Sequence, residues 1–288
     1  MRIAPDRTGA IGVRGRPMRG LALSDDAVGT LHEGRQAYVG VLAGAGPHVT
    51  PELYAWSSGR LWFASATTTL KTRVLRRRGR GAALVSAGGR DVLLRGPVRA
   101  YDLRHPIELG QAAADLPAAA LAWLGYSVRN APDLLAFAVD TAAGRLGSRV
   151  PPLRVLHALI PTSAAVAEGG TVAGHWGRWP GEVAAARHQG AVRGEPAVAA
   201  FPGPVVVPGG WDEATSTFRA TPGLLGLAGL PGRFPMSVVL DEYVGPGPAA
   251  KEGSLLRGEG TVAGPGSVVL DPERQVDWFG TDVVAGPA

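Results

Sequence analysis

Residues 60–78 combine the side chains that bind a phosphate group. An apolar run is followed by three threonines at positions 67–69 and then by Lys71. Only two of the chain's 29 lysine and arginine residues are lysines. Hydroxyl groups donate hydrogen bonds, an ammonium adds a point charge, and the first N–H groups of a helix attract anions. The pattern therefore predicts a phosphate site where a strand passes into a helix.

Local patterns predict the elements that would position these residues. Apolar alternation indicates a strand over residues 61–66, and the apolar residues after it follow helical spacing. Either Thr67 or Thr68 is expected to cap this helix, and Gly79 to end it after three arginines. Because threonine is common at helix starts, an ordinary amphipathic helix with a solvated lysine is the alternative.

The flanking sequence indicates a mainly β domain with flanking helices. Glycine-rich turns separate predicted strands at 37–42, 47–56 and 61–66. Two more strands are predicted at 81–86 and 91–100. Helices are expected at 24–33, where Ser24 is the cap, at 106–147 and at 180–189, and a strand at 153–160 is expected to close the first barrel.

Three motifs give residues 24–160 a resemblance to a known family: His48-Val-Thr-Pro51, Leu61-Trp-Phe-Ala64 and Thr69-Leu-Lys71. The family is that of the pyridoxamine 5'-phosphate oxidase-like, FMN-binding split barrels, which are flavin or deazaflavin oxidoreductases. The resemblance implies FMN as the cofactor, with a deazaflavin coenzyme as the alternative. Haem ranks below both. It is kept as an alternative because a related class of split barrels binds haem through histidine, which here would be His48 or His157.

The same resemblance implies a set of cofactor-binding residues. They are His48, Thr50, Pro51, Ser65, Ala66, Thr67, Thr68, Thr69 and Lys71. The threonines and Lys71 would hold the phosphate, with Arg73 or Arg76 as a second cation, while the other residues would border the ring. Glu52 departs from the family pattern and is expected to share a strand face with His48 and Thr50, unless it lies on the outer face.

The chain also repeats itself. Residues 56–75 and 211–230 align without a gap at an offset of 155, and neighbouring segments recur in the same order. Because the matching segments occur in the same order in both halves, the sequence predicts two tandem split barrels that form a pseudo-dimer. The alternative is chance similarity in a chain rich in alanine and glycine. Lys71 aligns with Gly226, so only the first barrel is expected to bind phosphate.

The repeat sets the expected domain boundaries. A flexible tail is expected over 1–21, the first barrel over 22–165, a linker over 166–177 and a degenerate second barrel over 178–288.

Composition limits the possible partners. The 288 residues include no cysteine, which excludes disulfides, thiolate metal sites and cysteine nucleophiles. The six histidines are scattered, so no metal site is predicted. The net charge of +5 comes without a nucleic-acid-binding motif, and no apolar run approaches 20 residues. We therefore expect a soluble cytoplasmic protein with a small-molecule substrate or cofactor, no nucleic-acid or membrane partner, and an intrachain pseudo-dimer that could act as a monomer.

The leading functional hypothesis is an oxidoreductase that depends on FMN or deazaflavin. Its substrate and catalytic residues cannot be read from the sequence, because this fold supports many activities. The alternatives are a non-enzymatic flavin- or haem-binding protein and a cofactor-free scaffold that binds a partner.

Overall fold

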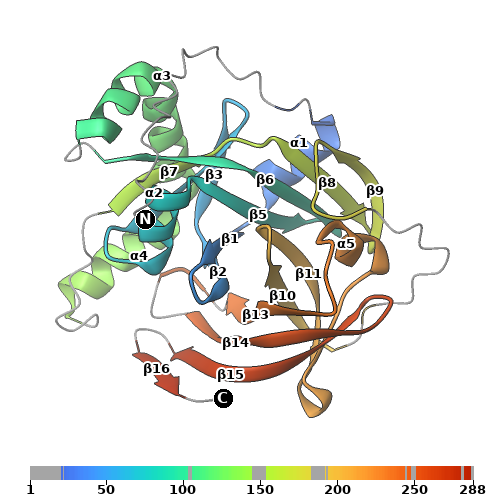
Figure 1. The fold of residues 1–288 in the computed structure, drawn as a ribbon. Helices are drawn as coiled ribbons and strands as arrows, with labels where there is room; N and C mark the ends of the chain where they lie inside the picture. The colour runs from blue at the N-terminus through green and yellow to red at the C-terminus, as the bar shows by residue number, and fades with distance from the viewer. Residues whose placement is uncertain are drawn as a thin grey trace, which may run out of the picture.

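The computed structural model describes residues 21, 23–102, 106–144, 154–182, 192, 194–243, 245–247, 251–279 and 282–286. These residues form two antiparallel sheets flanked by helices (Figure 1). Almost all of the predicted tail and most of the predicted helix at 180–189 lie outside the described residues. No helix in the described ranges is long and apolar enough to span a lipid bilayer.

The first sheet contains the N-terminal strands. They are β1 (Ala37–Ala43), β2 (Gly46–Glu52), β3 (Tyr54–Ser57), β4 (Arg60–Ala66), β5 (Arg80–Ala87), β6 (Arg90–Tyr101), β7 (Arg154–Leu159), β8 (Ser163–Glu168) and β9 (Thr171–Trp176). The strands pair in the order β2-β1-β5-β6-β7-β4-β3, while β8 pairs with β6 and β9. Because β2 and β3 pair with different neighbours on either side of Leu53, this barrel is split at that residue.

The second sheet contains the C-terminal strands and closes on itself. They are β10 (Glu195–Phe201), β11 (Val205–Asp212), β12 (Thr217–Arg219), β13 (Arg233–Tyr243), β14 (Lys251–Gly264), β15 (Ser267–Phe279) and β16 (Asp282–Gly286), with the short 3-10 helix η1 (Glu213–Thr215). The order is β12-β11-β10-β13-β14-β15-β16, and the additional β12–β15 pairing closes the barrel.

The two sheets repeat one pairing scheme, as the sequence repeat predicts. The path β1-β5-β6-β7-β4 corresponds to β10-β13-β14-β15-β12, and β2 with β3 corresponds to β11. The chain is a duplicated split barrel. The gapless alignment is wrong in one detail, because Trp56 pairs with Leu61 whereas Trp211 pairs with Phe218. The turn that contains η1 is longer than the turn between β3 and β4, so the second copy carries an insertion there.

Five helices flank the sheets in the described residues: α1 (Asp25–Glu33), α2 (Leu70–Arg78), α3 (Pro106–Arg129), α4 (Ala131–Ala142) and α5 (Pro222–Leu227). Ser24 caps α1, and Gly79 ends α2 in the left-handed conformation, both as predicted. The cap of α2 is Thr69 rather than Thr67 or Thr68. Thr69 is extended, and its hydroxyl accepts the Thr72 N–H at 3.2 Å, whereas residues 67 and 68 still belong to the turn.

The segment expected to be a linker, 166–177, is part of the first sheet. It contains the end of β8 and all of β9, and β8 continues the β6 ladder with Leu93 opposite Ala165. Ala165 and Ala167 are buried against side chains of the second barrel. Burial of these small residues between the barrels makes the segment a structural strand rather than a spacer.

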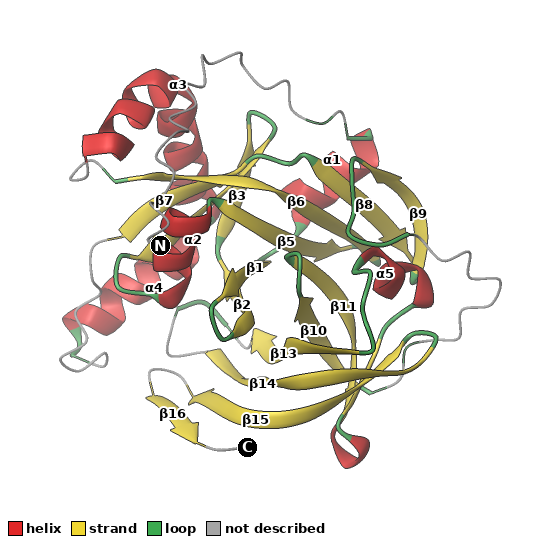
Figure 2. Cartoon of the chain, viewed as in Figure 1, coloured by secondary structure: helices red, strands yellow, loops and turns green. Residues whose placement is uncertain are grey.

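The barrels share one hydrophobic core. Val49, Leu84 and Leu93 of the first sheet pack in the same cluster as Phe201 and Phe218 of the second. A separate cluster fills the interior of the first barrel, and α3 and α4 lie along one side of that barrel (Figure 2). Because the barrels bury each other's apolar faces, they are packed together as one body.

Candidate functional site

Lys71 is buried at one end of the first barrel and does not lie on the surface of the protein. Only 2% of the residue is exposed, and its Nζ lies 6.0 Å from the centre of the Phe63 ring. Its ammonium forms an ion pair with the carboxylate of Glu52 on β2. The sequence placed Lys71 correctly at the start of a helix, but it did not predict that the ammonium is already engaged by a carboxylate.

The predicted strand residues lie where alternation places them. His48, Thr50 and Glu52 stand opposite Val41, Val39 and Ala37 of β1. These three β1 residues belong to the interior core of the first barrel. Directly opposed residues share a face of the sheet. The face shared by His48, Thr50 and Glu52 is therefore confirmed to be the inner one, not the outer face left open for Glu52.

Two of the three threonines are exposed to solvent to some degree, and the third is used by the fold. Thr67 and Thr68 lie in the turn between β4 and α2. The Thr69 hydroxyl donates to the Ala66 carbonyl at 3.0 Å while it caps the helix. The first N–H groups of α2 have no partner within the helix. The hydroxyls of Thr67 and Thr68, which the fold leaves at least partly exposed, are thus the polar side-chain groups that this turn offers to an anion.

Three buried polar atoms near this end of the barrel have no hydrogen-bond partner: Thr50 Oγ1, Ser65 Oγ and His157 Nδ1. Ser65 lies two residues beyond Phe63 on β4, and His157 stands opposite Phe63 on β7, so all three point into the barrel. Buried polar groups are nearly always paired in native proteins. Two of the three belong to predicted cofactor-binding residues, which fits a site that a ligand completes.

His157 is completely buried and neutral. Its ring stacks on Phe63 at 5.1 Å, and its Nε2 lies 3.3 Å from the Thr72 hydroxyl. Burial, with smaller contributions from the charges of Lys71 and Arg76, lowers the pKa of His157 to about 3. His48 is similar, because burial and then the charges of Arg257 and Lys71 lower its pKa to about 3.

These two histidines predict a loss of stability in mild acid. The folded pKa lies below the ordinary value of 6.5, so the unfolded chain takes up protons that the folded chain refuses. Stability is complete above about pH 6.5 and falls by about 1.4 kcal/mol per pH unit for each histidine as the pH drops toward 3. Urea unfolding between pH 7 and pH 4 measures the free energy of unfolding as a function of pH. For the His157→Phe variant, this dependence should be shallower than the parent's by about 1.4 kcal/mol per pH unit.

The control for this experiment is His175→Phe, because His175 is exposed on β9. That variant should keep the slope of the parent. Equal slopes for the parent and the His157→Phe variant would contradict the neutral, buried state of His157.

Arg154 lies beside the candidate site, and no sequence motif predicts it there. It begins β7, stands opposite Ala66, and its guanidinium lies 5.5 Å from the centre of the Phe137 ring. It also lines a cavity of about 140 Å³ together with Pro51 and Glu52. Only the β4–β7 pairing brings this arginine beside the predicted residues, and no local signal marks it.

The sequence predicts Arg73 or Arg76 of α2 as a second cation for the phosphate, but Arg76 is already engaged by carboxylates. Arg76 forms ion pairs with Asp102 and Glu108 at 2.8 and 2.7 Å. Arg73 is exposed on α2. Outside α2, two guanidinium groups lie beside the predicted residues: that of Arg154, which stands opposite Ala66, and that of Arg257 on β14, which contacts the His48 ring. Among the described residues no group of three histidine, aspartate or glutamate side chains is arranged to hold a metal ion.

The cavity beside the predicted site is partly open to solvent and is bordered by α4 and by the second barrel. Leu134 and Phe137 of α4 line it, and so does Gly247 from the connection between β13 and β14. The Gly247 N–H donates to the Asp133 carboxylate at 3.1 Å, which fastens α4 to the second barrel. A volume of about 140 Å³ is below the roughly 300–1,000 Å³ of typical ligand pockets.

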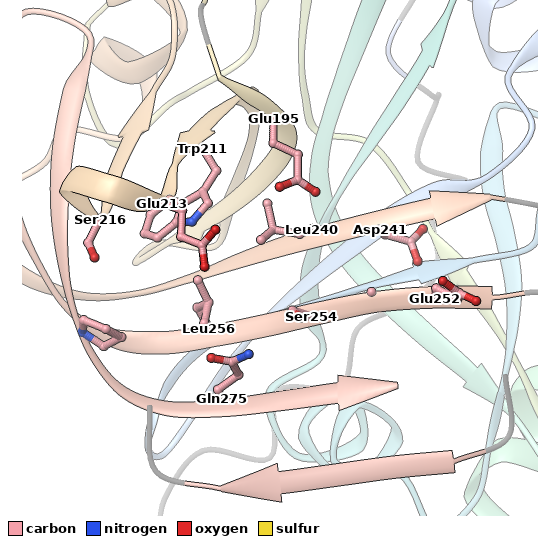
Figure 3. A pocket seen from close by; sticks show the side chains of 12 residues that line it. Glu195, Trp211, Glu213, Ser216, Leu240, Asp241, Glu252, Ser254, Leu256 and Gln275 are labelled. Carbon is pink, nitrogen blue, oxygen red and sulfur yellow. The ribbon is translucent and has the colours of Figure 1, made fainter. Parts of the chain in front are cut away.

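A larger cavity, about 470 Å³, lies at the open end of the second barrel. Figure 3 shows Glu195, Glu213, Asp241 and Glu252 around it, together with the ring of Trp211. Four carboxylates create a negative potential that repels an anion. This cavity therefore does not suit a cofactor phosphate, despite its size.

In the described part of the second barrel, the helix that corresponds to α2 lacks the polar residues of the Lys71 site. Its helix α5 has the sequence Pro-Gly-Leu-Leu-Gly-Leu, which offers neither a cation nor a hydroxyl. Thr221 precedes it without a side-chain cap bond. The second barrel also buries two hydroxyls without partners, those of Thr221 and Ser237, but its helix α5 places no cation beside them.

No protein-family model matches the sequence, and no curated protein matches it. Several solved structures resemble half of the chain. A pyridoxamine 5'-phosphate oxidase-related, FMN-binding protein from Nostoc punctiforme is 14% identical with a TM-score of 0.39, and the match covers 51% of this chain and 85% of that one. A FAD-binding protein from Mesorhizobium loti is 17% identical with a TM-score of 0.33, covering 50% and 94%.

An F420 reductase is 17% identical with a TM-score of 0.30, and the match covers 49% of this chain and 98% of that one. Because these TM-scores are low, the assignment of a duplicated split barrel depends on the strand pairing of this chain itself.

Proposed function

We propose that the first barrel binds a phosphate-bearing flavin or deazaflavin cofactor and that the protein is an oxidoreductase. One observation carries this proposal. Lys71, Arg154 and the start of α2 converge on one end of the first barrel, where the buried hydroxyls of Thr50 and Ser65 lack partners. Cations beside a helix N-terminus favour a phosphate, and unpaired hydroxyls favour a polar ligand.

Each residue has a distinct role in this proposal. Lys71 and the first N–H groups of α2 would hold the phosphate, and the turn hydroxyls of Thr67 and Thr68 would add hydrogen bonds. Thr50 and Ser65 would bond to polar atoms of the remaining cofactor. A bound flavin would supply the redox chemistry, while the protein binds and orients it. Because Glu52 pairs with Lys71, the phosphate has to compete with this carboxylate.

The size of the cavity adds a condition. A cofactor larger than about 140 Å³ requires the elements around the cavity to move apart. The most direct movement is that of α4, whose Leu134 and Phe137 side chains line the cavity. We therefore expect cofactor binding to be accompanied by a displacement of this helix.

Haem is a weaker candidate on geometric grounds. His157 is enclosed between Phe63 and Thr72, and His48 contacts the guanidinium of Arg257 on β14. Either ring would have to leave these contacts to coordinate iron. The cofactor-free scaffold makes no use of the unpaired hydroxyls, and it becomes the leading account if no cofactor is bound.

The absorption spectrum of the freshly purified protein tests the proposal. Flavin maxima, a single deazaflavin band, a Soret band and an empty spectrum distinguish the four possibilities. Calorimetric titration of the cofactor-free protein with FMN should give one site per chain, because α5 lacks polar side chains. Two equivalent sites would contradict this assignment, and the absence of both a bound cofactor and FMN binding would refute the proposal.

A further inference from the structure

The helices α3 and α4 are amphipathic in the reverse sense. The described charged residues of α3 turn toward the protein and are engaged there. Glu108 pairs with Arg76, Asp115 pairs with Arg99 at 2.8 Å, and Arg129 donates to backbone carbonyls of residues 32 and 34. A surface helix normally turns its apolar residues inward and its charges outward.

The helix α4 shows the same reversal. Its most buried residues are two aspartates, Asp133 and Asp140. Its large aliphatic residues Leu135 and Val139 are exposed instead. Two consecutive helices thus bury their charges and leave most of their large apolar side chains in water, although Ala122, Tyr126 and Leu134 pack inward. This arrangement costs free energy unless another surface covers the exposed side chains.

We define the apolar face of the two helices by their exposed large apolar side chains. It consists of Leu116, Leu121, Trp123, Leu124, Val128, Leu135 and Val139, whose exposed fractions range from 49% to 69%. At roughly 100 Å² for each of these half-exposed side chains, the two helices together expose on the order of 700 Å² of apolar surface. The largest apolar patch on a typical monomer is about 300–600 Å², and a standard protein interface buries about 800 Å² per partner.

We propose that this apolar face is covered by the same face of a second copy of the chain. Two rows at four-residue spacing form it on α3: Leu116, Ala120, Leu124 and Val128 in one row, and Pro117, Leu121 and Gly125 in the other. Rows at this spacing pack into the grooves of an identical helix at an angle of about −50°. Small residues between the leucines supply the grooves, so the face complements itself.

A lipid surface fits these residues less well. Helices that lie on membranes carry lysine and arginine on their polar face. The sequence of α3 and α4 contains one basic residue, Arg129, and it is bound to carbonyl oxygens of the same chain. The hairpin has an apolar face large enough for a protein interface, but it lacks the cations that attract anionic lipids.

Sedimentation velocity tests this proposal. The parent protein is expected to sediment at twice the mass of one chain at micromolar concentration. The double variant Leu121→Glu/Leu124→Glu should weaken self-association by at least about a hundredfold, because it places four charges in the apolar interface of a dimer. Its circular dichroism spectrum should match the parent's, because both side chains are exposed in the single chain. A parent protein that is still monomeric at roughly 100 µM would overturn the proposal.

The matched control is Val262→Glu, which changes a 40% exposed valine on β14 and should leave the dimer intact. Cross-linking gives a second readout that does not depend on the folding of the glutamate variant. The chain has no cysteine, so Ala120→Cys introduces a single thiol at the centre of the face. Oxidation should yield a covalent dimer for Ala120→Cys and little for Val262→Cys.

Equal cross-linking yields for the two cysteine variants would also overturn the proposal. So would a monomeric parent that co-sediments with vesicles of phosphatidylcholine and phosphatidylglycerol, because the face would then bind lipid rather than a second copy.

Discussion

Replacing Lys71 by alanine is expected to lower the free energy of unfolding by about 2–4 kcal/mol in the absence of any ligand. The reason is the Glu52–Lys71 ion pair, which involves a lysine side chain that is 3% exposed and a carboxylate that is 18% exposed. Removing one partner of a buried pair leaves the other charge uncompensated, which costs roughly 3–5 kcal/mol when burial is complete. Partial exposure of Glu52 reduces that cost. Urea denaturation at pH 7 measures it.

This expectation replaces the one that the sequence supports. A solvated lysine contributes little to stability, so the sequence alone predicts almost no effect of Lys71→Ala. The double variant Glu52→Gln/Lys71→Met isolates the pair, because neither side chain is then charged. Its loss of unfolding free energy should be smaller, by about 1–3 kcal/mol, than the summed losses of the single variants Glu52→Gln and Lys71→Met. Lys251→Ala, at the only other lysine, is the control. An unchanged urea midpoint for Lys71→Ala would show that the ion pair does not form.

The second large effect is on the affinity for FMN. If Lys71 binds the phosphate, Lys71→Ala should weaken binding roughly tenfold to a hundredfold, since a charge-assisted contact is worth about 1.5–3 kcal/mol. Glu52→Gln should change the affinity in the opposite direction, by about tenfold, because the competing carboxylate is gone. Isothermal titration at a temperature where every variant is folded measures both changes.

The opposite signs distinguish a binding role from a structural one. If the pair only held the barrel end together, both substitutions would weaken FMN binding through the same loss of order. Lys71→Arg should restore only part of the affinity, because the planar guanidinium needs a different geometry from an ammonium. Equal losses in Lys71→Ala and Glu52→Gln would contradict the phosphate role of Lys71.

The sequence alone determined the local structure of this protein. Ser24 and Gly79 mark helix ends by the chemistry of caps, and glycine-rich turns separate the strands of the meander. The repeat indicated two barrels, and the strand pairing repeats accordingly. Alternation also placed His48, Thr50 and Glu52 on one face. These features depend on neighbouring residues or on periodicity, which the sequence records directly.

Only the tertiary structure decided how the charged and polar side chains are paired. Glu52 and Lys71 are 19 positions apart, and His48 and Arg257 are 209 apart. Their encounters depend on the break between β2 and β3 and on the packing of one barrel against the other. Arg154 lies beside the predicted residues because β7 pairs with β4.

The orientation of α3 and α4 likewise depended on the tertiary structure. The sequence predicts a helix over residues 106–147, but not which of its faces turns outward. Asp133 decides this by accepting the Gly247 N–H of the second barrel, and Asp115 by binding Arg60 and Arg99. Long-range ion pairs and hydrogen bonds carry no periodic signature in the sequence, because their partners are brought together only when the strands have paired.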